Sequence, residues 1–148
     1  MSNATSTEPP LSAPLYGATF GQAVQRFFKK YATFSGRASR SEYWWWVLAS
    51  VIVSTVFSLL ISIGISGSVD PVAGTFTPGP LAYIGYIGSG LWALAILIPT
   101  LAVTWRRLHD TNRSGGFFFL ALIPFVGPII VLIFTLLPTD PAGARFDR

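Results

Sequence analysis

Two short stretches of this chain contain eight of its 17 Lys, Arg, Asp, Glu and His side chains, the groups that could do chemistry. Residues 34–44 contain three of them and residues 106–116 contain five: Arg37, Arg40 and Glu42, then Arg106, Arg107, His109, Asp110 and Arg113. Planar guanidinium groups bind pairs of oxygen atoms, as in carboxylates and phosphates. These residues could therefore form an ion-pair network that fixes the register of helices. They could also form a site for an anionic lipid headgroup or another phosphate ligand.

The same residues give little support to catalysis. His109 and Asp110 are adjacent, so their side chains project in different directions, and no nucleophile motif accompanies them. The sequence has no Gly-x-Ser-x-Gly, no His-Glu-x-x-His and no phosphate-binding loop. A single histidine and the lack of cysteine argue against a metal site with several nitrogen or thiolate ligands. We predict no catalytic residues, no metal and no cofactor. An enzyme that acts on a lipid at the interface, for which His109 or Asp110 would be indispensable, is the third hypothesis, after a non-enzymatic protein and a transporter or channel subunit.

The elements that must position these residues are strongly apolar. Of 148 residues, 51% are hydrophobic and 11% are charged, with a mean hydropathy of +0.56, whereas soluble proteins are about 25% charged. This excludes a free cytosolic globule and a disordered chain. Three stretches without charge, residues 43–65, 81–105 and 117–137, each exceed the roughly 20 helical residues that cross a bilayer. They predict three transmembrane helices.

An amphipathic helix is predicted before the first span, over residues 19–32. Thr19 and Gln22 have the form of a capping box. Apolar residues recur at helical spacing, with a cationic side opposite: Phe20, Val24, Phe27, Phe28 and Tyr31 against Arg26, Lys29 and Lys30. Such a helix could lie in the membrane interface or pack against the other helices. The predicted fold class is an all-α membrane protein with three transmembrane helices preceded by an amphipathic interfacial helix.

The basic residues predict the orientation of the chain. Residues 1–16 are expected to form a flexible tail without a cleavable signal, followed by one integral-membrane domain over 17–148 that ends in a tail at 138–148. Five basic residues precede the first span and three follow the second, whereas residues 66–80 contain none. Positive residues favour the cytoplasmic side, so the N-terminus is predicted to be cytoplasmic. Three spans then place the C-terminus on the periplasmic or extracellular side, and it would switch sides if the third span did not cross.

Small residues recur at intervals of four in the first two spans. They are Ser50, Ser54, Ser58 and Ser62, and then Gly85, Ser89 and Ala93. Such stripes let helices approach closely, and we expect them to pack the two spans together. The alternative is that these faces assemble a homo-oligomer that acts as a small transporter or channel. No ionisable residue lies within any predicted span, so no proton relay or ion site is indicated.

Two blocks resemble the signature blocks of a known family. They are Phe34-Ser-Gly-Arg-Ala-Ser-Arg-Ser-Glu-Tyr-Trp, within residues 30–45, and Arg106-Arg-Leu-His-Asp-Thr-Asn-Arg-Ser-Gly. Both are similar to blocks of the domain of unknown function 805 family, over about residues 20–147. The run from Ile123 to Pro128, whose prolines predict a kink or break, matches a third element. The chain departs from the family at Gly116-Phe117, where tryptophan is usual, and in its tail from Gly143 to Asp147.

The resemblance implies a small, multi-helix protein of the bacterial inner membrane with no settled activity. Together with the charge map, it leads us to predict a non-enzymatic protein whose cytoplasmic Arg, Glu and Asp cluster organises the helices. The expected partners are membrane lipids, anionic ones in particular, or a partner protein. A nucleic-acid partner is not expected, because the orientation of the spans already explains the net charge of +4.

Overall fold

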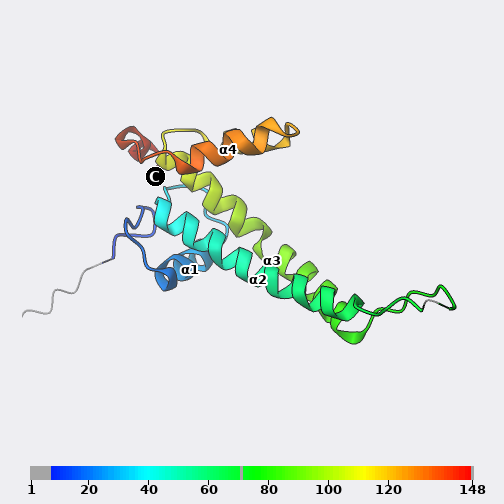
Figure 1. Cartoon of the computed structure of the whole chain (residues 1–148). Coiled ribbons are helices and arrows are strands. Elements are labelled where there is room, and N and C mark those ends of the chain that lie inside the picture. Colours follow the sequence, from blue (N-terminus) through cyan, green and yellow to red (C-terminus); the bar gives the residue numbers. More distant parts are fainter. Residues whose placement is uncertain (1–7, 71, 148) are drawn as a thin grey trace, which may run out of the picture. The chain divides into compact units, whose positions relative to one another are not determined.

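The computed structural model describes residues 8–70 and 72–147, which fall into two compact units. The first unit combines the described residues up to Trp46 with those from Ile98 onward, and the second unit is Val47–Leu97. The boundary passes through two long helices, α2 (Arg40–Ile65) and α3 (Pro80–Asp110), so each helix contributes to both units (Figure 1). The fold of the described residues is all-helical apart from one isolated β-bridge between Val69 and Phe76.

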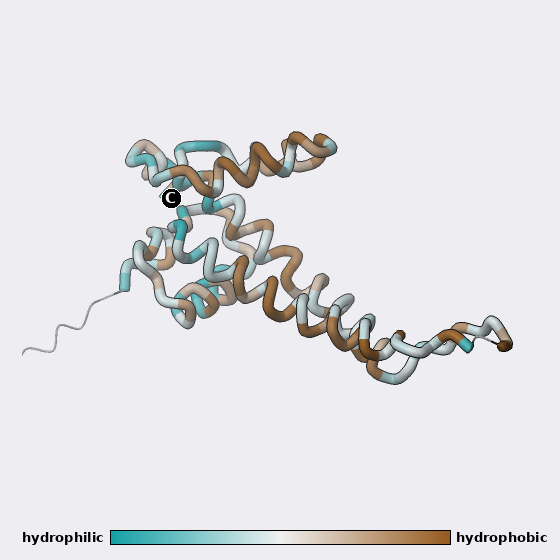
Figure 2. The backbone as a smooth tube through the Cα atoms, viewed as in Figure 1, coloured by the Kyte–Doolittle hydropathy of each residue, from teal (hydrophilic) through white to brown (hydrophobic). Residues whose placement is uncertain are grey.

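Helices α2 and α3 contain the first two predicted spans. They are 26 and 31 residues long, with mean hydropathies of 2.3 and 1.8 in their most apolar windows. Only 6% and 11% of those windows is buried, whereas a core helix of a soluble protein would be mostly buried. Figure 2 shows the apolar residues along both helices. Among the described residues, these two helices are long and apolar enough to cross a membrane.

The contact between α2 and α3 in the second unit depends on glycine. A Cβ atom added to Gly85 would lie 2.6 Å from a side-chain carbon of Ile61 and 3.0 Å from the carbonyl oxygen of Phe57. Gly88 lies against the Phe57 ring, and Gly64 lies against the backbone of Ala82. Gly85 therefore lies in the contact. The other small residues differ: Ser54, Ser58, Ser62 and Ala93 are exposed, and Ser50 and Ser89 are half-buried, so the contact on α2 instead uses Phe57, Ile61 and Gly64.

Helix α1 (Phe20–Lys29) begins with the predicted capping box and packs on protein. Gln22 N–H donates to the Thr19 hydroxyl, and the Thr19 N–H donates to the Gln22 side chain. The buried face of the helix includes Phe27, which stacks on Trp46 at the start of α2. This face also contains Arg26 and, at the C-cap, Lys30. Arg26 and Lys30 are therefore buried together with Phe27 and do not lie on a side opposite to it.

The predicted third span is not a continuous helix. Residues 117–137 are divided between the 3₁₀ helix η1 (Gly115–Leu122) and α4 (Val126–Leu136), with a reversal at residues 123–125. Pro124 has no backbone N–H to donate, and Phe125 has a positive φ of 64° with ψ of −54°, the geometry of a γ-turn in which the Val126 N–H donates to the Pro124 carbonyl oxygen at 2.8 Å. The 11 residues of α4 extend only about 16 Å, half of a bilayer core. A second 3₁₀ helix, η2 (Pro141–Phe146), ends the described chain.

Candidate functional site

A capping box holds Glu42 inside the first unit. The Glu42 N–H donates to the Ser39 hydroxyl (3.1 Å), and the Ser39 N–H donates to Glu42 Oε2 (2.9 Å). Leu15 N–H donates to the same carboxylate oxygen at 3.1 Å. This reciprocal pattern, Ser-x-x-Glu, is a sequence signature of helix N-termini. It leaves the other carboxylate oxygen, Oε1, free to accept from cations.

Two buried cations of α1 face that oxygen. Arg26 Nε donates to Glu42 Oε1 at 2.6 Å, and the Arg26 guanidinium also donates to the carbonyl oxygens of Pro9 and Ala13. Lys30 Nζ lies 3.8 Å from the same oxygen, which is an ion pair but beyond hydrogen-bond distance. The Lys30 side chain is 1% exposed, yet its ammonium has no hydrogen-bond partner among the described residues. The Glu42 carboxylate is therefore hydrogen-bonded to Arg26, and Lys30 forms only the longer ion pair with it.

Arg106 adds a third positive charge to this neighbourhood. Its Nε donates to the Ala102 carbonyl oxygen at 3.1 Å, but its Nη2 has no hydrogen-bond partner in the described part of the chain, although the residue is 2% exposed. The pKa of Lys30 is lowered to about 8, chiefly by burial; the charge of Glu42 opposes this decrease, and the positive charges of Arg106 and Arg26 add to it. We call Arg26, Lys30, Glu42 and Arg106 the Glu42 cluster. It contains three cations and one carboxylate.

A second cluster surrounds Asp110, the last residue of α3, and its charges are matched. Arg107 donates to Asp110 Oδ2 and to the carbonyl oxygens of Thr135 and Leu137, at the end of α4. The Tyr16 hydroxyl donates to Asp110 Oδ1 at 3.1 Å, and the Thr139 hydroxyl donates to Oδ2 at 2.7 Å. Arg107 and Asp110 are both fully buried. This pair ties the chain before α1, the end of α3 and the end of α4 together.

The C-terminal segment completes the first unit. The His109 ring stacks on Phe146 at a centroid distance of 4.0 Å, and its Nδ1 lies 3.0 Å from the Gly36 carbonyl oxygen. Asp147 accepts two hydrogen bonds from Arg37, which raises the pKa of Arg37. Residues 36–37 and 146–147 are thus in direct contact.

The structure divides the predicted cluster of eight residues. Arg107, Asp110 and Arg37 belong to the group of side chains around Asp110, which we call the Asp110 cluster. Arg37 Nη1 lies 3.8 Å from Asp110 Oδ1. Glu42 and Arg106 belong to the Glu42 cluster. Arg40 is exposed, and Arg113 lies 4.3 Å above the Phe134 ring, away from both. The sequence reasoning missed the roles of five residues: Tyr16, Arg26, Lys30, Thr139 and Asp147.

A detectable signal existed for two of the missed residues. Ala23, Arg26, Phe27 and Lys30 follow the i, i+3, i+4, i+7 spacing of one helix face. Because that face contains both apolar and cationic residues, a division of the helix by polarity places Phe27 on one side and Arg26 and Lys30 on the other. No local signal predicts the contacts of Tyr16 or Asp147, whose partners lie 94 and 110 residues away in the sequence.

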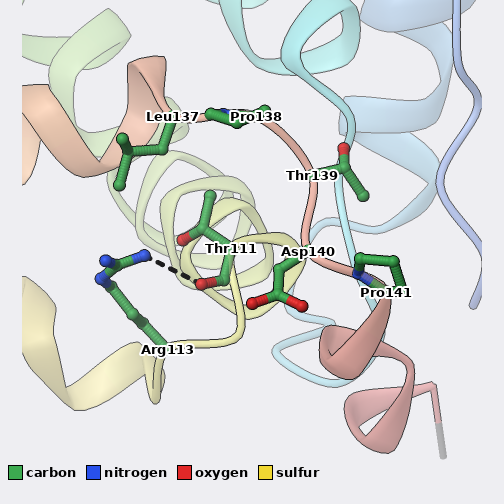
Figure 3. Close-up of a pocket in the computed structure, with 7 residues that line it drawn as sticks. All are labelled: Thr111, Arg113, Leu137, Pro138, Thr139, Asp140 and Pro141. Atoms are coloured by element: carbon green, nitrogen blue, oxygen red, sulfur yellow. Dashed lines mark hydrogen bonds between the residues drawn. The ribbon is translucent and has the colours of Figure 1, made fainter.

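A pocket of about 280 Å³ lies beside the Asp110 cluster, lined by Thr111, Arg113 and residues 137–141 (Figure 3). Its charged groups already have partners. Arg113 donates to the Thr111 carbonyl oxygen at 2.9 Å, and the Asp140 carboxylate accepts from the Ala142 N–H at 2.9 Å. Two buried cationic donors without a hydrogen-bond partner among the described residues, Lys30 Nζ and Arg106 Nη2, lie instead in the Glu42 cluster.

Comparisons with known proteins give the family but no activity. A family model described as "Protein of unknown function (DUF805)" matches residues 31–148. The chain is 33% identical to the inner membrane protein YhaH of Escherichia coli (strain K12) over 121 residues, which is 82% of this chain and 89% of that protein. It is 36% identical to the inner membrane protein YhaI of the same strain over 107 residues, 72% and 75% of the two chains. No solved structure matches the chain.

Proposed function

From the premise that this chain belongs to the DUF805 family, we propose an inner-membrane protein that binds a phosphate-type anion through Lys30 and Arg106. The ligand class includes the headgroup of an anionic phospholipid and a soluble phosphate. The protein is non-enzymatic in this proposal. Its Asp110 cluster organises the helices, and its Glu42 cluster provides the binding site.

The single observation behind the proposal is an imbalance of buried charge. Among the described residues, four Lys and Arg side chains are buried, Arg26, Lys30, Arg106 and Arg107, against two buried carboxylates, Glu42 and Asp110. Arg26 is paired with Glu42 and Arg107 with Asp110. Lys30 and Arg106 remain without a carboxylate of their own. A buried charge without a counterion is costly, so an anion would be stabilised there.

Phosphate fits the unsatisfied donors better than a single carboxylate does. Lys30 Nζ and Arg106 Nη2 offer donors from two different elements, and a phosphate group presents several acceptor oxygens in different directions. Arg106 follows directly after the uncharged part of α3, where lipid headgroups meet the cytoplasmic ends of membrane helices. A headgroup is therefore the first source to test.

The described residues also support a cytoplasmic position for both ends of the chain. The Arg37–Asp147 contact places the segment before α2 beside the segment after α4, and α4 is too short to carry the chain across the membrane. With two spans, the eight basic residues between Arg26 and Arg40 and between Arg106 and Arg113 lie on one side. We infer that this side is the cytoplasm.

Access to the site requires local movement, because both donor atoms are covered. Residues 31–35, which follow Lys30 directly, are exposed along their whole length. This segment has no regular secondary structure beyond its first turn. Its displacement would open the Glu42 cluster without breaking the Asp110 cluster.

Native mass spectrometry of the detergent-solubilised protein tests the proposal. We expect Lys30→Gln and Arg106→Gln to lose retention of added phosphatidylglycerol. The exposed neighbours Lys29→Gln and Arg40→Gln remove the same charge and should retain the lipid. Equal losses of lipid retention in all four variants would mean that the anionic lipid is attracted to positive charge in general, which would contradict a specific site. Unchanged retention of the lipid by folded Lys30→Gln would also reject the site.

A second arm separates the two sources of phosphate. Inorganic phosphate, added in the absence of anionic lipid, should raise the thermal stability of the unsubstituted protein but not of Lys30→Gln if the ligand is soluble. If only phosphatidylglycerol has this effect, the site takes a lipid headgroup. Stabilisation of Lys30→Gln equal to that of the unsubstituted protein by both ligands would contradict the proposal.

A second candidate, self-association into a small transporter or channel subunit, is favoured by the serine face of α2. Ser54, Ser58 and Ser62 are exposed, so they are available to a second copy of the chain. The hydroxyl of Ser62 donates to the Ser58 carbonyl oxygen within the same helix. Replacing Ser54 and Ser58 by Leu should then reduce the oligomer mass in mild detergent. An unchanged mass would exclude assembly through this face.

A further inference from the structure

Residues 114–139 form an apolar hairpin that is exposed on many sides. This stretch contains no charged residue. At the reversal between η1 and α4, Phe125 is 89% exposed and Leu122 is 75% exposed. The two arms expose further large apolar side chains: Phe117, Phe119, Ile129, Leu132, Ile133 and Leu136. Such a surface is too apolar to face water.

Both ends of the hairpin are held at the same point, the end of α3. At its start, Arg113 N–H donates to the Leu108 carbonyl oxygen at 3.0 Å. At its end, Asp140 N–H donates to the Asp110 carbonyl oxygen at 2.9 Å, and Thr139 and Arg107 add the contacts already described. The chain therefore leaves the end of α3 at Arg113 and returns to it at Asp140.

The two arms pack closely along their length. Gly127 lies against the Leu120 carbonyl, where a Cβ atom would clash with the backbone. Phe117 and Phe134 meet edge to face at 5.9 Å. Eight residues of 3₁₀ helix and eleven of α-helix each extend about 16 Å. Each arm thus has half the length of the roughly 30 Å hydrocarbon core.

We propose that residues 114–139 form a re-entrant hairpin whose apolar tip inserts into the acyl chains of a single leaflet. The occupant of this surface is lipid rather than a protein, because apolar side chains are exposed on both arms and at the tip, whereas a docked partner needs one face. The length of the arms and the common anchor of the two ends agree with insertion to the middle of the bilayer. This inference concerns a different part of the chain from the Glu42 cluster and does not depend on the anion site.

Single-cysteine labelling tests the hairpin directly, since the chain has no cysteine of its own. A membrane-impermeant thiol reagent is applied to inverted and right-side-out vesicles that contain the full-length protein. We expect Ser114→Cys and Ala142→Cys to react only in inverted vesicles. Phe125→Cys and Leu122→Cys should not react in either kind. Ser66→Cys, in the loop between α2 and α3, is the control that should react only in right-side-out vesicles.

A depth measurement covers the case in which a tip cysteine is simply hidden by protein. An environment-sensitive fluorophore at residue 125 should be quenched more by lipids brominated in the middle of the acyl chain than by lipids brominated near the headgroup. Labelling of Phe125→Cys or Ala142→Cys in right-side-out vesicles would overturn the proposal in favour of a complete crossing. Labelling of Phe125→Cys in inverted vesicles, or an absence of quenching by any brominated lipid, would also overturn it.

Discussion

The guanidinium of Arg37 holds the carboxylate of Asp147 through two hydrogen bonds of 2.8 and 2.6 Å, although the two residues are 110 positions apart. Each side chain is partly exposed. Next to this pair, Phe146 stacks on His109, and Gly143 lies so close to the His109 carbonyl that a side chain would clash. The C-terminal segment therefore packs against the end of α3 and the segment before α2.

We expect Asp147→Asn to lower the free energy of unfolding by about 1 kcal/mol. Two charge-assisted hydrogen bonds weaken, but solvent near the pair screens its attraction. The measurement is thermal unfolding in detergent micelles, with Lys29→Gln as a control that changes one exposed charge. Equal stability of Asp147→Asn and the unsubstituted protein would mean that the tail is not held by this pair.

Asp110→Asn should be more damaging, because it leaves the fully buried Arg107 without a counterion. Loss of one partner of a buried pair costs about 3–5 kcal/mol. Replacing both residues, as Arg107→Met with Asp110→Leu, should cost less than the sum of the two single variants, since no uncompensated charge remains. A double-mutant cycle measured by chemical unfolding gives the coupling. Additive effects would show that the pair does not act as a unit.

The first two spans could be predicted from the sequence because hydropathy is a property of consecutive residues. The hairpin could not, since Phe117–Leu137 has the same composition as a span. The difference lies in the backbone of three residues, where Pro124 lacks a donor and Phe125 has a positive φ. A kink was expected there, whereas a full reversal depends on the contacts of both arms with the end of α3.

The candidate site was predicted in part for a similar reason. Glu42, Arg106 and Asp110 lie in polar stretches next to the spans, so the pattern of charges in the sequence identifies them as candidate site residues. Arg26 and Lys30 lie within an amphipathic segment whose inner side depends on a distant carboxylate and on Trp46. Periodicity identifies a helix face, but the partner that buries the face must come from the tertiary structure.

The stability of the protein should depend on pH through Lys30. The pKa of Lys30 is lowered from 10.5 to about 8 in the folded protein, so the folded state binds this proton more weakly than the unfolded state. Stability should therefore rise with pH between about 8 and 10.5, by up to about 3 kcal/mol. Unfolding is measured in phosphate-free buffer. Lys30→Met should be more stable at pH 7 and should lose this part of the slope.

The ligand should show the opposite dependence on pH. An anion at the Glu42 cluster favours the protonated form of Lys30, so retention of phosphatidylglycerol should fall as the pH rises through about 8. Arg40→Gln should keep the same pH profile, because Arg40 is exposed and outside the cluster. Retention that does not change between pH 7 and 9 would place the headgroup elsewhere.

Two glycines of α3 distinguish a packing face from an open one. Gly85→Ala adds a methyl group within 3.0 Å of the α2 backbone, so the helices must separate, at a cost of about 1–3 kcal/mol. Gly90→Ala meets no atom within 4 Å and should be neutral or stabilise the helix by up to about 1 kcal/mol. Unfolding of both variants in micelles gives the comparison. If Gly90→Ala were the more damaging change, a neighbouring molecule would have to lie against that side of α3, because the side is open within the chain.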